Sequence, residues 1–287
     1  MVRAMRIECV VLDLDGTFTD LSREAPAFSA AFAGLAADLL GRPVDDVWAE
    51  AERSVRARAP ELAWTMGGHA VAPADADPYI LASCVAHEVF DGLGVLTREP
   101  ALRADIISTL FRRAYRHTGA AFRPGAAHLL EALLGRGLPV CFVTNAPAEV
   151  AQAKLDTLAL AERARLSVRG DACKFMIGPP SRPDARMARV PREKRLPGLT
   201  RPLLLERGRY FDALAAVWET TGARPETTLV CGDIFELDLA LPAELGAHVH
   251  FVKRPRTHAY ELDALAALGD RAGVSDGLAA VLARLDP

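Results

Sequence analysis

The sequence predicts an α/β protein: a Rossmann-like, doubly wound parallel sheet with an all-helical domain inserted into it. The sheet is predicted because short apolar runs rich in β-branched residues recur along the chain, separated by segments of helical periodicity. Strands that alternate with helices form βαβ units, and these units pair their strands in parallel. The insertion is predicted because a long segment after the first run carries helical patterns only.

Five apolar runs are predicted as strands. The first follows Glu8, runs from Cys9 to Leu12 and ends where Leu12 meets Asp13. Runs without alternating polar residues are typical of strands that are buried on both faces of a sheet. The later strands are Leu138–Thr144, Arg165–Val168, Thr228–Cys231 and His248–Val252. The predicted helices between and after them include Ala126–Leu134, Tyr210–Trp218 and Leu237–Leu245.

Residues 21–117 are predicted to form the helical domain, and residues 1–20 and 118–287 the core. Phe28, Phe32 and Leu35 recur at the spacing of one helix face. A loop rich in Gly, Pro and Asp at 67–78 divides this block, and we find no convincing strand in it. A second insertion, residues 178–209, is rich in Pro and Arg, so we predict an extended loop within the core.

The charge of the chain argues against two classes of partner. Its net charge is −3, so the protein has no overall positive charge that would attract nucleic acid or an anionic membrane. Locally, residues 181–209 carry nine Lys or Arg against three Asp or Glu. Three interpretations of this basic segment stay open: it covers an anionic substrate, docks an acidic partner, or is a solvated loop.

The cysteines predict the redox environment. The five are never closer than 32 residues apart, and no Cys-x-x-Cys pair exists. A signal peptide is not expected, because Asp13 interrupts the first apolar run after four residues. We therefore expect a reduced, soluble, cytoplasmic protein.

Polar side chains follow each predicted strand at its carboxyl end. Parallel strands meet at one edge there, and ligands of such sheets bind at that edge. Several carboxylates gathered at one edge are costly without a cation, and carboxylate oxygens suit Mg²⁺, which usually works with substrate phosphates. The sequence therefore predicts a Mg²⁺ and phosphoryl site. Its residues are Asp13, Asp15, Thr144, Asn145, Lys174, Asp233 and Asp238.

Three of these segments resemble the motifs of the haloacid dehalogenase-like superfamily of phosphohydrolases. Asp13-Leu-Asp-Gly-Thr17 resembles the first motif, Val143-Thr-Asn145 the second, and Val230-Cys-Gly-Asp-Ile-Phe-Glu-Leu-Asp238 the fourth. Their order and their strand-end positions agree with the family. The resemblance implies that residues 21–117 correspond to the family's cap domain, placed after the first motif.

The resemblance also implies the roles of the reacting groups. Asp13 would be the nucleophile that forms an aspartyl-phosphate. Asp15 would protonate the leaving oxygen and then activate the hydrolytic water. Family members that cleave carbon–halogen bonds lack this second aspartate, because halide leaves without a proton. Its presence favours phosphoryl chemistry over dehalogenation.

Further positions are implied to bind the substrate and the metal. Gly16 permits the turn after the strand, Thr17 orients it, and Asn145 lines the pocket. Thr144 would bond a phosphoryl oxygen. Mg²⁺ would be held by Asp13, the backbone carbonyl of Asp15 and Asp233, with Asp238 as a direct ligand or just behind one. Asp238 could instead merely cap the following helix.

The cation that balances the phosphoryl group is harder to place. Family members often carry it in a Lys-Pro sequence, which is absent from this chain. We expect Lys174, near the carboxyl end of the third strand. Arg207, Arg209 and Lys194 remain alternatives, while Lys154 is expected a turn or more from the sheet edge.

The sequence thus predicts a Mg²⁺-dependent phosphatase that hydrolyses a small phosphomonoester. Two alternatives stay open: a phosphomutase with the same core machinery, and a non-catalytic binding or regulatory protein that retains the fold. The substrate and the oligomeric state stay open as well. The string Gly273-Val-Ser-Asp-Gly277 fits the serine-hydrolase pattern, but we expect no strand before it and interpret Ser275 as a helix cap.

Overall fold

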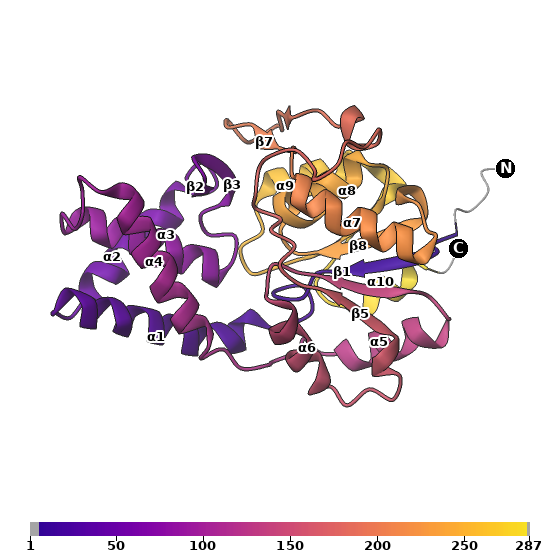
Figure 1. Cartoon of the computed structure of the whole chain (residues 1–287), viewed down its shortest axis with the longest axis horizontal. Helices are drawn as coiled ribbons and strands as arrows, with labels where there is room; N and C mark the ends of the chain where they lie inside the picture. Colours follow the sequence, from indigo (N-terminus) through magenta and orange to yellow (C-terminus); the bar gives the residue numbers. More distant parts are fainter. Residues whose placement is uncertain (1–5, 286–287) are drawn as a thin grey trace. The chain divides into compact units, whose positions relative to one another are not determined.

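A six-stranded parallel sheet forms the centre of the larger part of the chain (Figure 1). The structure is a computed structural model that describes residues 6–285. The strand order is β10-β9-β8-β1-β4-β5, with β1 inside the sheet. The strands are β1 (Cys9–Leu12), β4 (Val140–Val143), β5 (Leu166–Arg169), β8 (Thr228–Gly232), β9 (His248–Val252) and β10 (Ala272–Ser275). The predicted Rossmann-like α/β fold is confirmed.

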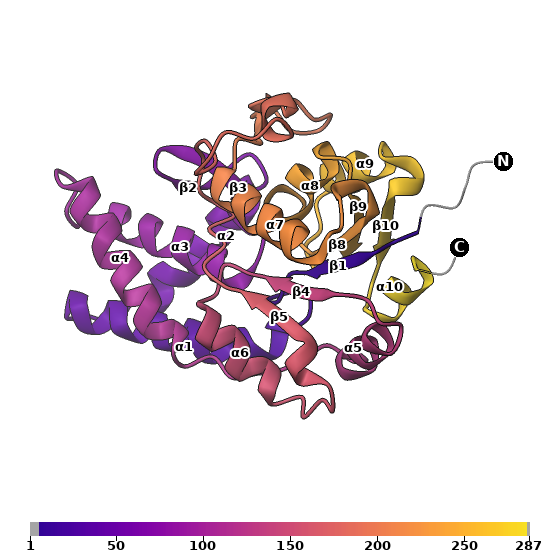
Figure 2. The same ribbon diagram turned by 45° about the vertical axis from the view of Figure 1, so that its right-hand side comes forward.

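Helices cover both faces of this sheet. Successive residues of a strand point to opposite faces, so each strand contributes side chains to two apolar cores. On β1, Cys9 and Val11 face one apolar cluster and Val10 and Leu12 face the other. The first cluster packs under α7 (Gly208–Thr221), α8 (Ala240–Glu244) and α9 (Ala259–Ala266), and the second under α5 (Ala126–Gly135), α6 (Ala148–Asp156) and α10 (Ala279–Ala283). Figure 2 shows these helices around the sheet.

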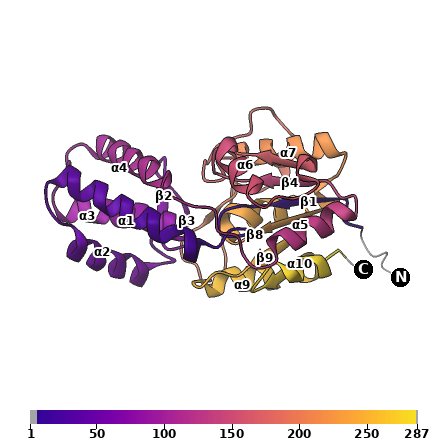
Figure 3. The ribbon, with the colours of Figure 1, turned by 90° about the horizontal axis from the view of Figure 1, so that it is seen from below.

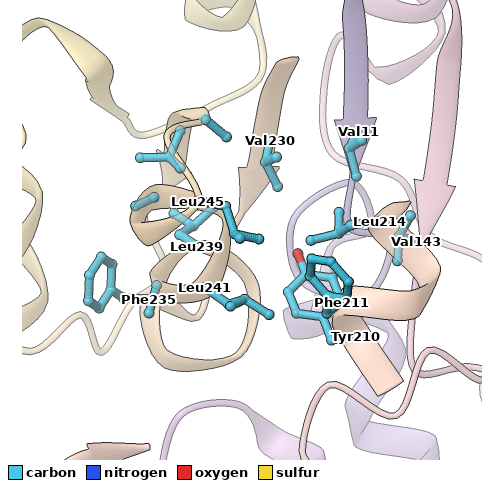
Figure 4. Close-up of a cluster of buried hydrophobic side chains, with 14 of the residues drawn as sticks. Val11, Val143, Tyr210, Phe211, Leu214, Val230, Phe235, Leu239, Leu241 and Leu245 are labelled. Carbon is cyan, nitrogen blue, oxygen red and sulfur yellow. The ribbon is translucent and has the colours of Figure 1, made fainter. Parts of the chain in front are cut away.

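The first cluster is the larger, and it supports the edge of the sheet where the polar residues gather. Figure 4 shows Val11 and Val143 beside Tyr210, Phe211 and Leu214 of α7, and Val230 of the third neighbouring strand belongs to the same cluster. These six side chains are all almost fully buried. Burial of each aliphatic or aromatic group contributes about 1.5–3 kcal/mol. The packing therefore holds β1, β4 and β8 rigidly beside one another.

The chain between β1 and α5 contains four long helices, which lie side by side in Figure 3. They are α1 (Leu21–Leu40), α2 (Asp45–Arg58), α3 (Pro78–Gly92) and α4 (Pro100–Tyr115). Phe28 and Phe32 of α1 pack edge-on against Phe111 of α4, and Phe28 against Tyr79 of α3. An aromatic core thus joins three of these helices.

The expectation that residues 21–117 contain no strand is wrong at one place. β2 (Ala63–Met66) and β3 (His69–Pro73) form a hairpin. Its two-residue turn is Gly67-Gly68, with φ of 57° and 81°. Two consecutive positive φ angles define the turn that matches the twist of a hairpin, and glycine reaches them without strain. The Gly pair, which we had assigned to a loop, was the signal for these strands.

Contacts divide the chain into two compact units. Of the described residues, one unit comprises 6–20, 65–71 and 122–285, and the other 21–64 and 72–121. No helix in the described part of the chain is long and apolar enough to cross a membrane.

The second insertion is more ordered than the extended loop we predicted. It contains a short antiparallel pair, β6 (Glu193–Lys194) and β7 (Leu203–Leu204). Its Leu196, Leu199 and Leu203 are buried in the first cluster. The apolar residues among its prolines and arginines therefore anchor the segment. The remaining short helical turns of the chain are η1 (Arg163–Arg165), η2 (Met187–Arg189), η3 (Pro225–Thr227), η4 (Phe235–Leu239) and η5 (Gly269–Arg271).

A further correction concerns Ser275. We expected no strand before it, yet β10 ends at this residue and pairs with β9. Its hydroxyl lies 2.8 Å from His250 Nε2 and donates to the carbonyl of Gly277 at 2.8 Å. With the hydroxyl proton on that carbonyl, the contact with His250 is a hydrogen bond in the tautomer whose Nε2 carries the proton. The Ser275 side chain contacts His250 and the Gly277 carbonyl, and so does not cap α10.

Candidate active site

Three aspartates converge at the carboxyl edge of the sheet. Asp13 directly follows β1, Asp233 follows β8, and Asp238 lies on the π-helical turn η4. All three are buried, and one carboxylate oxygen of each lies within 4.8 Å of the others. The parallel register of β1 with β8 brings the first two together, because Leu12 pairs with Cys231. These three residues, the acidic cluster, are the centre of the candidate site.

Lys174 is the cation of the acidic cluster. Its Nζ lies 2.7 Å from Asp13 Oδ1 and 2.8 Å from Asp238 Oδ1, and the residue is 1% exposed. Burial on its own would lower the pKa of Lys174, but the carboxylates of Asp13 and Asp238 outweigh it and raise the pKa. The ammonium is therefore charged. Burial raises the pKa of Asp13 to about 7, against the opposing effect of Lys174.

A strained loop delivers Lys174 to this place. Asp171 and Cys173 hold positive φ angles of 52° and 46°, which are costly for residues with a side chain. Gly170 leaves no room for a Cβ, which would lie 2.2 Å from Ala148 N. At the end of the loop, Lys174 N donates to Asn145 Oδ1 at 2.8 Å. Asn145, predicted to line the pocket, thus contacts the backbone of the lysine.

Thr144 directly follows β4 and is buried. Its Oγ1 accepts from Ala146 N at 3.2 Å, which closes a turn beyond the strand. The part it plays toward a phosphoryl group stays a prediction.

Gly16 and Thr17 lie in the turn after β1, and Thr17 connects this turn to the end of β8. The Thr17 hydroxyl lies 3.0 Å from Asp13 Oδ2 and 2.9 Å from Asp233 Oδ1, so it can donate to either carboxylate. Gly16 has φ of 90°, and its carbonyl accepts two bonds from Arg123, at 2.9 and 2.6 Å. Sequence reasoning had not singled out Arg123. It braces the turn that carries the motif.

Asp15 has a partner that the sequence analysis placed wrongly. Lys154 Nζ lies 2.7 Å from Asp15 Oδ1, although we expected Lys154 away from the sheet edge. The reason is geometric: side chains on a helix lean toward its N-terminus, and α6 begins just beyond β4. From the last turn of α6, a long lysine side chain reaches back to the edge.

The residues fit a divalent cation. Three carboxylates gather beside the one ammonium that pairs with Asp13 and Asp238, so a second positive charge would stabilise this buried place. Carboxylate oxygens are the donors that Mg²⁺ prefers. Asp13 and Asp233 are the best placed to bind it. Both oxygens of Asp238 already accept, Oδ1 from Lys174 and Oδ2 from the backbone N–H groups of Asp233 and Ile234.

A second group of buried charges holds the turn that carries Asp238. Glu236 on η4 is fully buried and accepts two bonds from Arg201, at 2.9 and 2.6 Å, and one from Tyr260 at 2.6 Å. The Arg254 guanidinium donates to the carbonyl of Asp233 and also to the carboxylate of Glu261, the latter at 2.7 Å. Arg201 comes from the second insertion, so this segment contributes directly to the support of the site.

The alternative cations lie elsewhere. Arg207 is fully buried, but its guanidinium donates to the carbonyls of Lys174, Leu204 and Val71. Lys194 pairs with Glu244 at the surface. Arg209 is exposed. Among the residues that the structure describes, Lys174 is thus the basic side chain in direct ion pairs with Asp13 and Asp238.

Fold and site together define a class: a Rossmann-like α/β protein with a lysine-paired aspartate cluster at the carboxyl edge of its sheet. Residues 7–189 match the family model of the haloacid dehalogenase-like hydrolases, and the chain belongs to this family. A search of curated protein sequences found no significant match.

Solved structures of low sequence identity share the fold. A predicted phosphoglycolate phosphatase from Haemophilus somnus aligns with a TM-score of 0.55 at 14% identity, covering 96% of this chain and 97% of that one. A haloacid dehalogenase-like family protein from Streptococcus pneumoniae aligns at 0.53 and 16%, covering 96% and 97%. A hydrolase from Pseudomonas syringae aligns at 0.52 and 17%, covering 97% and 98%.

Proposed function

We propose that this hydrolase is a Mg²⁺-dependent phosphatase acting on a small phosphomonoester, with residues 21–117 as its cap. The observation that carries the proposal is the presence of Asp15 close to Asp13 in the turn after β1, next to a buried acidic cluster whose oxygens suit a divalent cation. Loss of a halide needs no proton, whereas an alcohol leaving group does. Asp15 therefore favours phosphate esters over haloacids.

In the proposed mechanism, Asp13 attacks phosphorus and the ester oxygen leaves with a proton from Asp15. Water then attacks the aspartyl-phosphate, gives its proton to Asp15, and releases inorganic phosphate and the free Asp13 carboxylate. Lys174 offsets negative charge beside Asp13 throughout. Mg²⁺, when bound by Asp13 and Asp233, would favour the ionised nucleophile and neutralise phosphoryl charge.

The test is turnover of 4-nitrophenyl phosphate and of a 2-haloacid, each with Mg²⁺ and with EDTA. We expect phosphate release that requires Mg²⁺, and no halide release. Asp13→Asn keeps the shape of the side chain but removes the nucleophile, so turnover should fall by at least about 10³-fold. Activity of this variant within tenfold of the wild type, on homogeneous protein, would refute the assignment.

Product analysis separates the phosphatase from the alternative phosphomutase. With a sugar phosphate as substrate, a phosphatase releases inorganic phosphate, whereas a mutase returns the group to another hydroxyl. A binding protein would show neither product while still binding the sugar phosphate in calorimetry.

A further inference from the structure

Lys154 is a buried charge beside a reacting group. It lies in the last turn of α6, its side chain is 6% exposed, and its Nζ is 2.7 Å from Asp15 Oδ1. Removing an ammonium from water costs several kcal/mol unless a partner compensates it. The position is therefore built around this ion pair.

The basic composition of the chain points the same way. Of its 34 basic residues, only Lys154, Lys174, Lys194 and Lys253 are lysines. Two of them, Lys194 and Lys253, are partly exposed. The other two are buried beside Asp13 and Asp15. Arginine is the ordinary cation of this protein, and both buried lysines place a compact ammonium beside aspartates at the carboxyl edge of the sheet.

We propose that Lys154 is a positioning residue for Asp15, an inference that rests on the proposed function. A carboxylate three residues beyond a strand end can rotate, and a proton donor must point at the leaving oxygen to act. By holding Oδ1, Lys154 sets the direction in which the carboxyl group presents its proton. The bond also anchors α6 to the turn after β1, across 139 residues of sequence.

A purely structural ion pair and a positioning residue predict different kinetics. Proton donation matters in proportion to the basicity of the leaving group. Phenyl phosphate releases a basic phenolate, whereas 2,4-dinitrophenyl phosphate releases an anion that needs no proton. Because kcat/KM covers only steps up to the first irreversible one, it reports on formation of the aspartyl-phosphate and not on its hydrolysis.

The experiment compares Lys154→Met with Lys194→Met on these two substrates. Lys154→Met should lower kcat/KM about 10²-fold for phenyl phosphate, the usual contribution of a proton donor, and less than about threefold for 2,4-dinitrophenyl phosphate. Lys194→Met removes a surface lysine paired with Glu244 and should change neither value. Lys154→Arg, which keeps the charge but not the shape, should fall between Lys154→Met and the wild type for phenyl phosphate.

Equal losses on the two substrates, or no loss on either, would overturn the proposal. A wild-type enzyme that hydrolyses neither ester would instead overturn the proposed function, so the two failures are distinct. Thermal unfolding verifies that each variant is folded. If Lys154→Met does not fold, the ratio of the two kcat/KM values for Lys154→Arg decides, and a ratio equal to that of the wild type counts against the proposal.

Discussion

Gly16 is the residue on which the geometry of the motif depends most. Its φ of 90° lies in the region that glycine reaches freely and other residues do not. A Cβ placed there would lie 2.5 Å from Asp233 Oδ2, well inside any normal contact. The space that a side chain would need is occupied by a carboxylate of the acidic cluster. Gly16 thus allows both the backbone turn after β1 and the close approach of this turn to Asp233 at the end of β8.

Gly16→Ala should therefore damage the site more than the fold. We expect a loss of at least about 10²-fold in kcat/KM and weaker Mg²⁺ binding in calorimetry, with about 1–3 kcal/mol of destabilisation from strain. Gly125→Ala is the matched control, since its φ of 82° carries similar strain but no atom lies within 4 Å of the added Cβ. If both variants lose stability and neither loses activity, the close approach to Asp233 does not matter.

Lys174 carries the second prediction at this scale. Lys174→Ala leaves Asp13 and Asp238 buried without their ammonium, and turnover should fall by about 10²-fold or more. Binding of vanadate, a phosphate analogue, should weaken in parallel. Lys194→Ala should leave both unchanged, because its partner is the surface residue Glu244. The opposite ranking of the two variants would show that the cation is wrongly placed.

At the scale of elements, η4 is a short helical turn that contacts of side chains from other elements hold in place. Its backbone carries Asp238, and Tyr210 of α7 donates to the Asp238 carbonyl at 2.7 Å. Gly232, before the turn, leaves no room for a Cβ, which would lie 2.3 Å from Asp238 Cβ. The buried pair Arg201–Glu236 then fixes the outer side of the turn. Side chains of α7 and of the second insertion thus hold this short element in place.

Arg201→Met should test that support. It leaves Glu236 buried with Tyr260 as its remaining side-chain donor, so unfolding in urea should show a loss of about 3–5 kcal/mol. The double variant Arg201→Met/Glu236→Gln should recover part of it, because the unpaired charge is gone. Arg195→Met, an exposed arginine of the same insertion, serves as the control and should cost less than about 0.5 kcal/mol. Equal stability of Arg201→Met and Arg195→Met would contradict the role of the pair.

For the molecule as a whole, the buried histidine of β9 predicts how stability responds to acid. His250 is 2% exposed, and its surroundings include Arg284. Burial, aided by that arginine, lowers the pKa of His250 from 6.5 to about 4. Between pH 6.5 and about 4, His250 is therefore protonated in the unfolded chain but neutral in the folded protein. The contribution of the neutral imidazole to stability is complete above pH 6.5 and is lost as the pH falls toward 4.

His250→Gln should flatten this dependence. Each pH unit between 6.5 and 4 is worth up to about 1.4 kcal/mol, so the wild type should lose up to about 3 kcal/mol more than the variant over this range. Glutamine can keep a donor toward Ser275 but cannot take up the proton. Urea unfolding at several pH values measures the difference, with His69→Gln at an exposed site as the control. Parallel curves for wild type and His250→Gln would contradict the prediction.

Local sequence carried much of the fold and of the candidate site. The runs before Asp13, Thr144 and Asp233 are strands, and Asp13 and Asp233 from two of these strand ends do lie together at one edge. Parallel pairing alone brings strand ends together, so a motif at each end locates a site without knowledge of any contact. The hairpin β2–β3 and the edge strand β10 were missed, because each is short and rich in Ala or Gly.

The placement of Asp13, Asp15, Asp233 and Lys174 near strand ends could be predicted, because strands and turns are encoded within a few neighbouring residues. The ion-pair partners of the charged side chains could not be predicted in this way. Lys154 is separated from Asp15 by 139 residues and Arg201 from Glu236 by 35, and neither pair leaves a trace in local composition. Which cation meets which carboxylate depends on the path of the whole backbone and on the direction in which each helix points its side chains, and these exist only in the folded chain.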